Sequence, residues 1–315
     1  MGKKDLWQSD YFDDKRRFAD MFNGALFKGK QIMNVEELEE VDSKLIHHEK
    51  TGEVVNVIRD KVYRWRGQPV SICVLENQSY VDYRMVFRVM LEEAVSYIKQ
   101  QKRACEKWKE SGHRFDKNEF LSQMCKGEKY TPVITLILYL GTEQEWDGPK
   151  SLYEMLEIPE ELKPFVTNYK LNLFDYHGYT DFSFFKTENR IIFELLSCAK
   201  DKIKMEKIIR KNQYMLDKET IKAILGMLGI KVNLNKIMVK TEEGVRFSMC
   251  KAIDELKESG RQEGEREALK KSLKALVDSL KKVSLDVEAV YNAVIDNELY
   301  REVTKEQVKE YYYVR

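Results

Sequence analysis

The chain has 315 residues, which is enough for one sizeable hydrophobic core with an appended region, or for two modest domains. Hydrophobic residues make up 43% and charged residues 34%, a composition that excludes a disordered chain. The formal net charge is only +1, so any affinity for nucleic acid must come from local basic patches or a bound metal ion, not from the charge of the whole molecule.

The five cysteines are dispersed along the chain and form no CxxC pair: Cys73, Cys105, Cys125, Cys198 and Cys250. An odd, scattered set fits reduced thiols better than a disulfide framework or a zinc site. The first residues contain no apolar stretch of the kind that a signal peptide needs, and the longest apolar run, Val133 to Leu140, is too short to cross a bilayer. We therefore expect a cytoplasmic protein with no membrane-spanning segment.

Two helical segments are predicted near the start of the chain. Residues 13–27 begin with acidic side chains and place Phe18, Phe22 and Leu26 one turn apart, which predicts an amphipathic helix. Residues 35–48 are rich in acidic side chains and are predicted as a second helical segment.

The following segments change from strand-like to helical patterns. β-Branched and aromatic residues dominate 54–65 and 70–78, which flank an Arg-Gly-Gln-Pro break and are predicted to form a hairpin. Apolar residues recur at helical spacing from 82 to 108, and 131–141 is apolar nearly throughout, as a strand covered on both faces would be. The order strand, helix, strand predicts a crossover with parallel pairing, and therefore an α/β fold with helices against the sheet.

From about residue 188 onward the chain is predicted to be helical. Apolar residues at heptad spacing form a short seam over 269–283: Leu269, Leu273, Leu276, Leu280 and Val283. Two interpretations remain open, because the seam is short for an autonomous coiled coil: a helix packed on its own domain, or a homodimer formed through the C-terminal helices. Two glycines in 258–267 predict a flexible or frayed connector before the seam.

Polar residues at the end of the second predicted strand could carry chemistry. Glu76 and Gln78 are two positions apart, so their side chains project from the same face of the strand. Asp60 lies on the preceding strand, across the predicted hairpin. Two converging carboxylates repel each other unless a divalent cation neutralises them, and oxygen ligands of this kind suit Mg²⁺. The spacing alone fits this metal site and also fits ordinary surface carboxylates.

The context of these residues resembles a known family. The segments RDKVYRW, ENQS, YRMVFRVMLEEAVSY and TPVITLILYLGTEQEWDGPKSLYEML are similar to those of the Rpn family of recombination-promoting nucleases, also described as putative transposases. The family belongs to the PD-(D/E)XK nuclease superfamily, and the resemblance covers roughly residues 10–200. It implies an α/β nuclease domain, with a central mixed sheet flanked by helices, over residues 1–200. A helical C-terminal region would follow over 201–315.

The resemblance implies a metal-dependent DNA endonuclease, largely without sequence preference, that hydrolyses phosphodiester bonds in DNA recombination or transposition. Carried over by position, the catalytic residues are Asp60, Glu76 and Gln78. The ligands of Mg²⁺ or Mn²⁺ are Asp60, Glu76 and the backbone carbonyl of Asn77. Gln78 stands where the superfamily has Lys, so it can supply only the neutral part of that residue's role through its amide donors. Slower chemistry, or help from another cation such as Arg84, is therefore expected.

Basic residues near the proposed site could hold DNA through its phosphates. Arg84 and Arg88 are one turn apart at the start of the predicted long helix, and Arg64 and Arg66 end the preceding strand. Such contacts are independent of sequence. The alternative is that these side chains only solvate a surface. Asp20, on the first helix, either supports the site or faces solvent.

Two rival functions remain open from the sequence. One is a catalytically degenerate DNA-binding or regulatory protein. Adding a metal ion would not change the behaviour of such a protein. The other is an assembly protein that acts through its C-terminal helices. RNA in place of DNA is a further alternative substrate.

Overall fold

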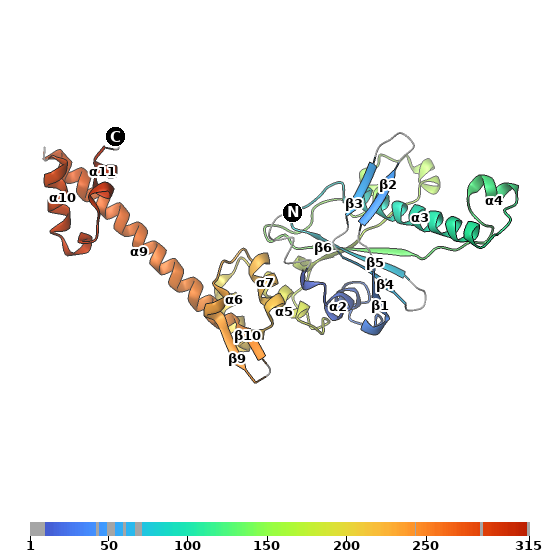
Figure 1. The fold of residues 1–315 in the computed structure, drawn as a ribbon, viewed down its shortest axis with the longest axis horizontal. Coiled ribbons are helices and arrows are strands. Elements are labelled where there is room, and N and C mark those ends of the chain that lie inside the picture. The colour runs from blue at the N-terminus through green and yellow to red at the C-terminus, as the bar shows by residue number, and fades with distance from the viewer. Residues whose placement is uncertain are drawn as a thin grey trace. The chain divides into compact units, whose positions relative to one another are not determined.

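The computed structural model describes the following residues: 10–41, 44–48, 54–58, 61–66, 71–242, 244–283 and 286–313. Over 44–48, 54–58 and 71–77 the description covers the backbone alone. The structure is mixed α/β (Figure 1). It divides into two compact units, Met1–Lys231 with Met238–Met249 (unit 1) and Val232–Ile237 with Cys250–Arg315 (unit 2). No helix within the described ranges is long and apolar enough to span a membrane.

Unit 1 is built on a five-stranded sheet with the strand order β1-β4-β5-β6-β7. The strands are β1 Leu38–Glu40, β4 Lys61–Trp65, β5 Ser71–Gln78, β6 Val133–Tyr139 and β7 Asn172–Asp175. β4 is antiparallel to both β1 and β5, whereas β6 is parallel to both β5 and β7. The helix α3, Met85–Glu110, connects β5 to β6. The predicted long helix, the buried strand and the parallel crossover are therefore confirmed.

Helices cover both faces of this sheet. The helix α2, Lys15–Ala25, begins after the capping side chain of Asp14, and the ring of its Phe18 lies 4.6 Å from the ring of Tyr63 on β4. On the other face, Met85 of α3 shares one hydrophobic cluster with Ile137 of β6. Tyr63 and Ile137 occupy register positions of opposite parity across β4, β5 and β6, so the two helices pack on opposite faces.

The segment before β4 differs from its prediction. The described residues of 35–48 form no α-helix: η1 Val35–Glu37 is a short 3₁₀ turn, β1 pairs with β4, and β2 Lys44–His48 pairs with β3 Val54–Ile58 in a separate two-stranded sheet. The strand predicted over 54–65 is also two strands, because β3 pairs only with β2 whereas β4 pairs with β1 and β5. Strand partners distant in sequence decide both outcomes, and a local pattern does not contain them.

The rest of unit 1 surrounds the sheet with short elements. The helices are α4 Lys117–Ser122, α5 Asn189–Leu196, α6 Lys202–Asn212 and α7 Lys218–Met227, and the 3₁₀ turns are η2 Leu152–Met155, η3 Glu160–Phe165 and η4 Tyr176–Gly178. A second, three-stranded sheet has the order β8-β10-β9, from Met215–Leu216, Gly244–Ser248 and Met238–Thr241. The prediction of helix throughout after residue 188 was therefore wrong at these strands.

Unit 2 has a hydrophobic core of its own. Its helices are α8 Leu234–Ile237, α9 Met249–Lys282, α10 Val287–Ile295 and α11 Lys305–Tyr313, with the 3₁₀ turn η5 Glu298–Tyr300. Leu273 and Val277 of α9 share one cluster with Val290 and Val294 of α10, and Leu276 and Leu280 pack against it. The buried part of the heptad seam therefore packs within the chain. The ends of the seam remain exposed, Leu269 at 41% and Val283 at 67%.

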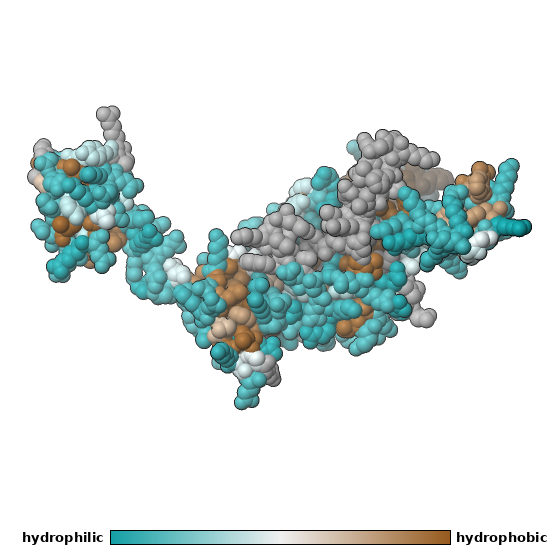
Figure 2. All heavy atoms as spheres, in the orientation of Figure 1, coloured by the Kyte–Doolittle hydropathy of each residue, from teal (hydrophilic) through white to brown (hydrophobic). Residues whose placement is uncertain are grey.

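The two glycines before the seam do not interrupt the helix. α9 runs without a break through Gly260 and Gly264, so the predicted flexible connector was wrong. Arg261 forms ion pairs with Glu258 and Glu265, one turn away on either side. Such pairs stabilise an exposed helix only slightly, because solvent screens them. Figure 2 shows this stretch of α9 as hydrophilic, which agrees with its exposure to solvent.

Candidate functional site

The residues predicted to be catalytic lie at the carboxyl end of β5. Asp60 lies outside the described residues, and Glu76 and Asn77 are described by their backbone alone. Gln78 is described in full and is only 6% exposed. The carbonyl oxygen of Gln78 accepts a hydrogen bond of 2.7 Å from the backbone N–H of Leu140, which fixes this strand end against the end of β6.

Polar side chains end three neighbouring parallel strands at one edge of the sheet. Gln78 of β5 pairs in register with Tyr139 of β6, which pairs with Asp175 of β7. In open α/β sheets, ligands bind outside the carboxyl ends of parallel strands, because the loops that follow diverge there. This edge is therefore the candidate functional site.

The loop after β5 contributes a buried carboxylate. Asp82 is 5% exposed and accepts a hydrogen bond of 2.9 Å from the backbone N–H of Arg84. The guanidinium groups of Arg84 and Arg88 lie 3.2 Å and 3.3 Å from its oxygens. Burial alone would raise the pKa of Asp82, but these hydrogen bonds outweigh it and hold the pKa below its usual value. Asp82 therefore stays ionised and orients both arginines at the start of α3.

The segment Trp146–Gly148 packs on the residues that follow β5. The indole N–H of Trp146 donates to the carbonyl oxygen of Gly148 at 2.9 Å, and the Tyr83 hydroxyl donates to Asp147 at 3.3 Å. A Cβ at Gly148 would lie 2.9 Å from Val81 Cγ1, so the close approach of the two segments requires glycine. This contact brings the family-like motif DGPKSLYEML to the candidate site.

An Asp–His pair at the end of β7 was not predicted from the sequence. Asp175 Oδ1 lies 2.6 Å from His177 Nδ1, and Asp175 Oδ2 accepts the backbone N–H of Trp146 at 2.7 Å. A cavity of about 460 Å³ beside His177 is lined by acids and by lysines, among them Glu143 and Lys200. The available signal was a short D-Y-H motif, but only the parallel pairing of β6 with β7 brings it to the same edge as Gln78.

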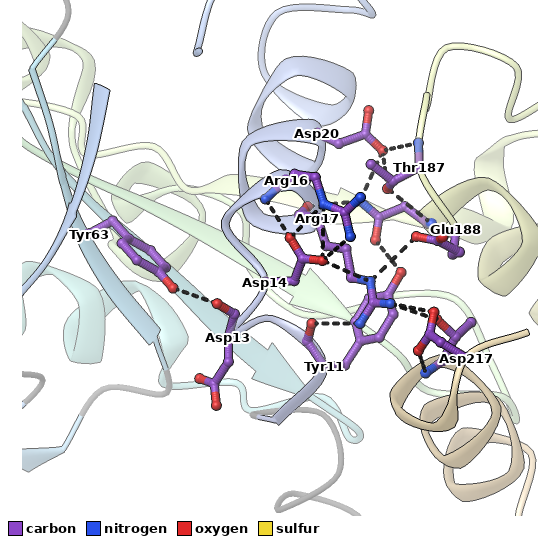
Figure 3. Close-up of polar contacts among 12 residues, drawn as sticks. Tyr11, Asp13, Asp14, Arg16, Arg17, Asp20, Tyr63, Thr187, Glu188 and Asp217 are labelled. Carbon is purple, nitrogen blue, oxygen red and sulfur yellow. Dashed lines mark hydrogen bonds and ion pairs between the residues drawn. The ribbon is translucent and has the colours of Figure 1, made fainter. Parts of the chain in front are cut away.

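Asp20 does not face solvent. It is 3% exposed and accepts hydrogen bonds from the backbone N–H groups of Lys186 and Thr187, from the Thr187 hydroxyl and from the Asn189 amide. Figure 3 shows this carboxylate on α2, directed at the segment before α5. The solvated interpretation was therefore wrong, because Asp20 is a buried anchor for that segment.

The four arginines predicted to hold DNA fall into two groups. Arg84 and Arg88 follow the carboxyl end of β5, whereas Arg64 pairs with Ile72 near its start. The two groups are therefore separated by the length of the strand, roughly 20 Å. Arg66 is paired with Glu39 at 2.7 Å. Arg64 has no acidic partner among the described residues.

A cluster of metal-ligand type occurs far from β5 in the sequence. The ligand atoms of His113, Glu119 and Cys125 all lie within 4.8 Å of one another. The Glu119 carboxylate already accepts hydrogen bonds from His113, from the backbone N–H of Asp116 and from that of Lys126. The bond from Asp116 is part of the capping box of α4, and the three bonds together account for the position of Glu119.

The five-stranded sheet and the helices around it define a mixed α/β protein. The chain belongs to the family described as "Putative transposase, YhgA-like", whose model matches residues 30–223. The match includes the whole five-stranded sheet and α3. The family resemblance stated from the sequence is therefore confirmed. No match was found among curated proteins or among solved structures.

Proposed function

We propose that the chain is a metal-dependent DNA endonuclease, largely without sequence preference, that acts in DNA recombination or transposition. Membership of the transposase-like family supports DNA as the substrate. The element order α2, β1, β4, β5, α3, β6, with β4 antiparallel and β6 parallel to β5, supports a PD-(D/E)XK core. We assign this activity to residues 1–200 and a supporting or assembly role to 201–315.

The main support for the proposal is the register between β4 and β5. Lys61 is paired with Leu75. Asp60 precedes Lys61 in the chain and Glu76 follows Leu75, so the proposal puts the two carboxylates opposite each other. Glu76 is paired with Ile137, which packs against α3, so the proposed site lies on the α3 side of the sheet.

The donor set fits a hard divalent cation. Carboxylates from Asp60 and Glu76, with the backbone carbonyl of Asn77, are oxygen ligands of the type that Mg²⁺ and Mn²⁺ accept. A cation bound there would polarise a phosphodiester and lower the pKa of a coordinated water.

Side chains of the same edge would position the substrate. In the proposal, the amide of Gln78 donates a hydrogen bond to a phosphate oxygen or to the attacking water, but contributes no positive charge. Arg84 contacts Asp82, yet its side chain is 78% exposed. The N–H donors that Asp82 does not use are therefore available to a phosphate. Arg84 would thereby supply the charge that Lys provides in the superfamily.

The test uses the purified full chain, supercoiled plasmid and Mg²⁺. We expect relaxed and linear products only with the metal ion, and a loss of at least about a hundredfold in Asp60→Asn and in Glu76→Gln. Glu161→Gln, an exposed carboxylate on η3, is the matched control and should cleave like wild type.

Two outcomes would contradict the proposal. Equal cleavage by the Glu76→Gln variant would show that the strand end is not the active site. A folded wild type that binds the plasmid without cutting it would favour the catalytically degenerate DNA-binding alternative. A parallel reaction with duplex RNA distinguishes the two substrates.

A further inference from the structure

A second basic site lies near the other end of α3. A cavity of about 450 Å³ opens between β4, the C-terminal half of α3 and the segment that leads into β6. Its lining includes four cations and two aromatic side chains: Arg64, Arg103, Lys107, Lys129, Trp108 and Tyr130. Arg103 is nineteen positions after Arg84, which corresponds to about 28 Å along the helix. The cavity is therefore separate from the edge where Gln78 lies.

The four cations of this cavity have no acidic partner in the described part of the chain. Arg64, Arg103, Lys107 and Lys129 form no ion pair with any described residue, in contrast to the paired Arg66, Arg84 and Arg88. The acid in the lining, Glu128, accepts the indole N–H of Trp108 at 2.8 Å. Four like charges around one cavity repel each other, and a bound anion would relieve that repulsion.

Two buried donors in the same cavity have no hydrogen-bond acceptor among the described residues. Arg64 Nε and the Tyr130 hydroxyl are shielded from solvent and make no hydrogen bond to the described part of the protein. Buried polar groups are nearly always hydrogen-bonded, so both donors fit an acceptor that a bound molecule would supply. Burial raises the pKa of Tyr130, so its hydroxyl stays protonated and can donate. A phosphate group offers several acceptor oxygens to such donors.

An aromatic face accompanies these donors. The Trp108 side chain is 37% exposed and is held by its bond to Glu128 and by the ring of His113, 4.9 Å away. Basic side chains beside a fixed aromatic ring are the combination that binds nucleic-acid strands, because cations hold phosphates while the ring stacks on a base.

We propose that this cavity binds a phosphate group, with its adjoining base, of a nucleic-acid strand. The choice of nucleic acid as the source of the phosphate rests on the proposed function, whereas phosphate binding itself does not. The spacing of about 28 Å from Arg84 corresponds to roughly eight base pairs of a duplex. The cavity would thus anchor DNA at a distance from the proposed cleavage site and fix its direction along α3.

The experiment measures binding and not cleavage. A fluorescent 20-base-pair duplex is titrated with the full-length Glu76→Gln protein across a salt series, with and without Arg64→Gln and Arg103→Gln together. We expect the double change to weaken binding at least tenfold and to flatten the salt slope by about two units, one for each lost contact. The matched control is Lys117→Gln with Arg266→Gln, two exposed cations outside the cavity, which should bind like the parent.

Two further measurements distinguish a nucleic-acid phosphate from free inorganic phosphate as the ligand of the cavity. Inorganic phosphate is titrated into each protein by calorimetry, and Trp108→Ala is compared on single-stranded DNA, where loss of stacking should weaken binding. If the Arg64 variant does not fold, Lys107→Gln with Lys129→Gln tests the same cavity from its exposed side.

Two results would overturn the inference. One is an unchanged duplex affinity and salt slope in the cavity variants. The other is a loss of inorganic phosphate binding while duplex binding stays intact, which would make the cavity a site for a small phosphate only. Neither result depends on cleavage, so the plasmid assay can fail or succeed independently.

Discussion

The guanidinium group of Arg17 donates a hydrogen bond of 2.6 Å to the carboxylate of Asp217, two hundred positions further along the chain. Arg17 lies on α2 and is 4% exposed, and Asp217 caps α7. The same guanidinium lies 3.4 Å from Glu188 and 4.4 Å from the centre of the Tyr11 ring (Figure 3). One buried cation therefore joins α2, the start of α5 and α7.

Removing this cation should destabilise unit 1. Arg17→Met leaves Glu188 and Asp217 without their partner, so we expect a loss of about 2–4 kcal/mol in the free energy of unfolding. Arg16→Met is the control, because Arg16 is 68% exposed and its pair with Asp14 should contribute less than about 1 kcal/mol. Urea unfolding measures both variants, and equal losses would show that the network does not join the three helices.

The carboxylate of Asp82 should make stability depend on acid pH. Its pKa is lower in the folded protein than the ordinary value of about 3.9, so its contribution is fully present above that value and is lost as the pH falls through the folded pKa. We expect Asp82→Asn to lose about 1–2 kcal/mol at pH 7, because hydrogen bonds to a charged group are lost. The difference from wild type should shrink below about pH 4.

Unfolding curves from pH 3 to pH 7 check this dependence. Glu157→Gln, an exposed carboxylate, is the control and should stay within about 0.5 kcal/mol of wild type. A difference between wild type and Asp82→Asn that stays constant down to pH 3 would contradict the role given to the charge of Asp82.

Long, strongly patterned elements could be predicted from the sequence. The helix predicted over 82–108 is α3, Met85–Glu110, and the apolar strand is β6, Val133–Tyr139, because many residues in each agree on one period. The acidic segment 35–48 was misassigned because its short strands are stabilised by β3 and β4, which follow it in the chain. Local patterns do not specify such partners.

The candidate site could be predicted only where its residues are neighbours in the sequence. Gln78 and Arg84 lie close together because β5 leads directly into α3. Asp175 and His177 reach the same edge only through the pairing of β7 with β6. The burial of Asp20 likewise depends on a segment 166 positions away, which no helical pattern reveals.

The heptad seam should stabilise unit 2 within one chain and should not form a dimer. Val277 is fully buried in the core of unit 2, so Val277→Ala should destabilise that unit by about 1–3 kcal/mol. Leu269 is 41% exposed, so Leu269→Ala should change stability by less than about 0.5 kcal/mol. Sedimentation should give the same molecular mass for both variants and wild type. A dimeric wild type that Leu269→Ala converts to a monomer would favour the homodimer interpretation instead.

Substitutions of Gln78 should change the rate of DNA cleavage more than the affinity for DNA. Gln78→Ala should slow plasmid cleavage about tenfold or more while leaving duplex affinity nearly unchanged, because the amide would act on the reacting phosphate or water and not on the bound strand. Gln78→Lys places a charge at a position that is 6% exposed, which is costly unless carboxylates lie beside it. In the proposed site Asp60 and Glu76 supply those carboxylates, so the Lys variant should fold and cleave at least as fast as wild type. Thermal unfolding and cleavage rates at fixed Mg²⁺ measure both effects. A Lys variant that is folded and binds DNA but is inactive would show that this strand end is arranged differently from the proposed site.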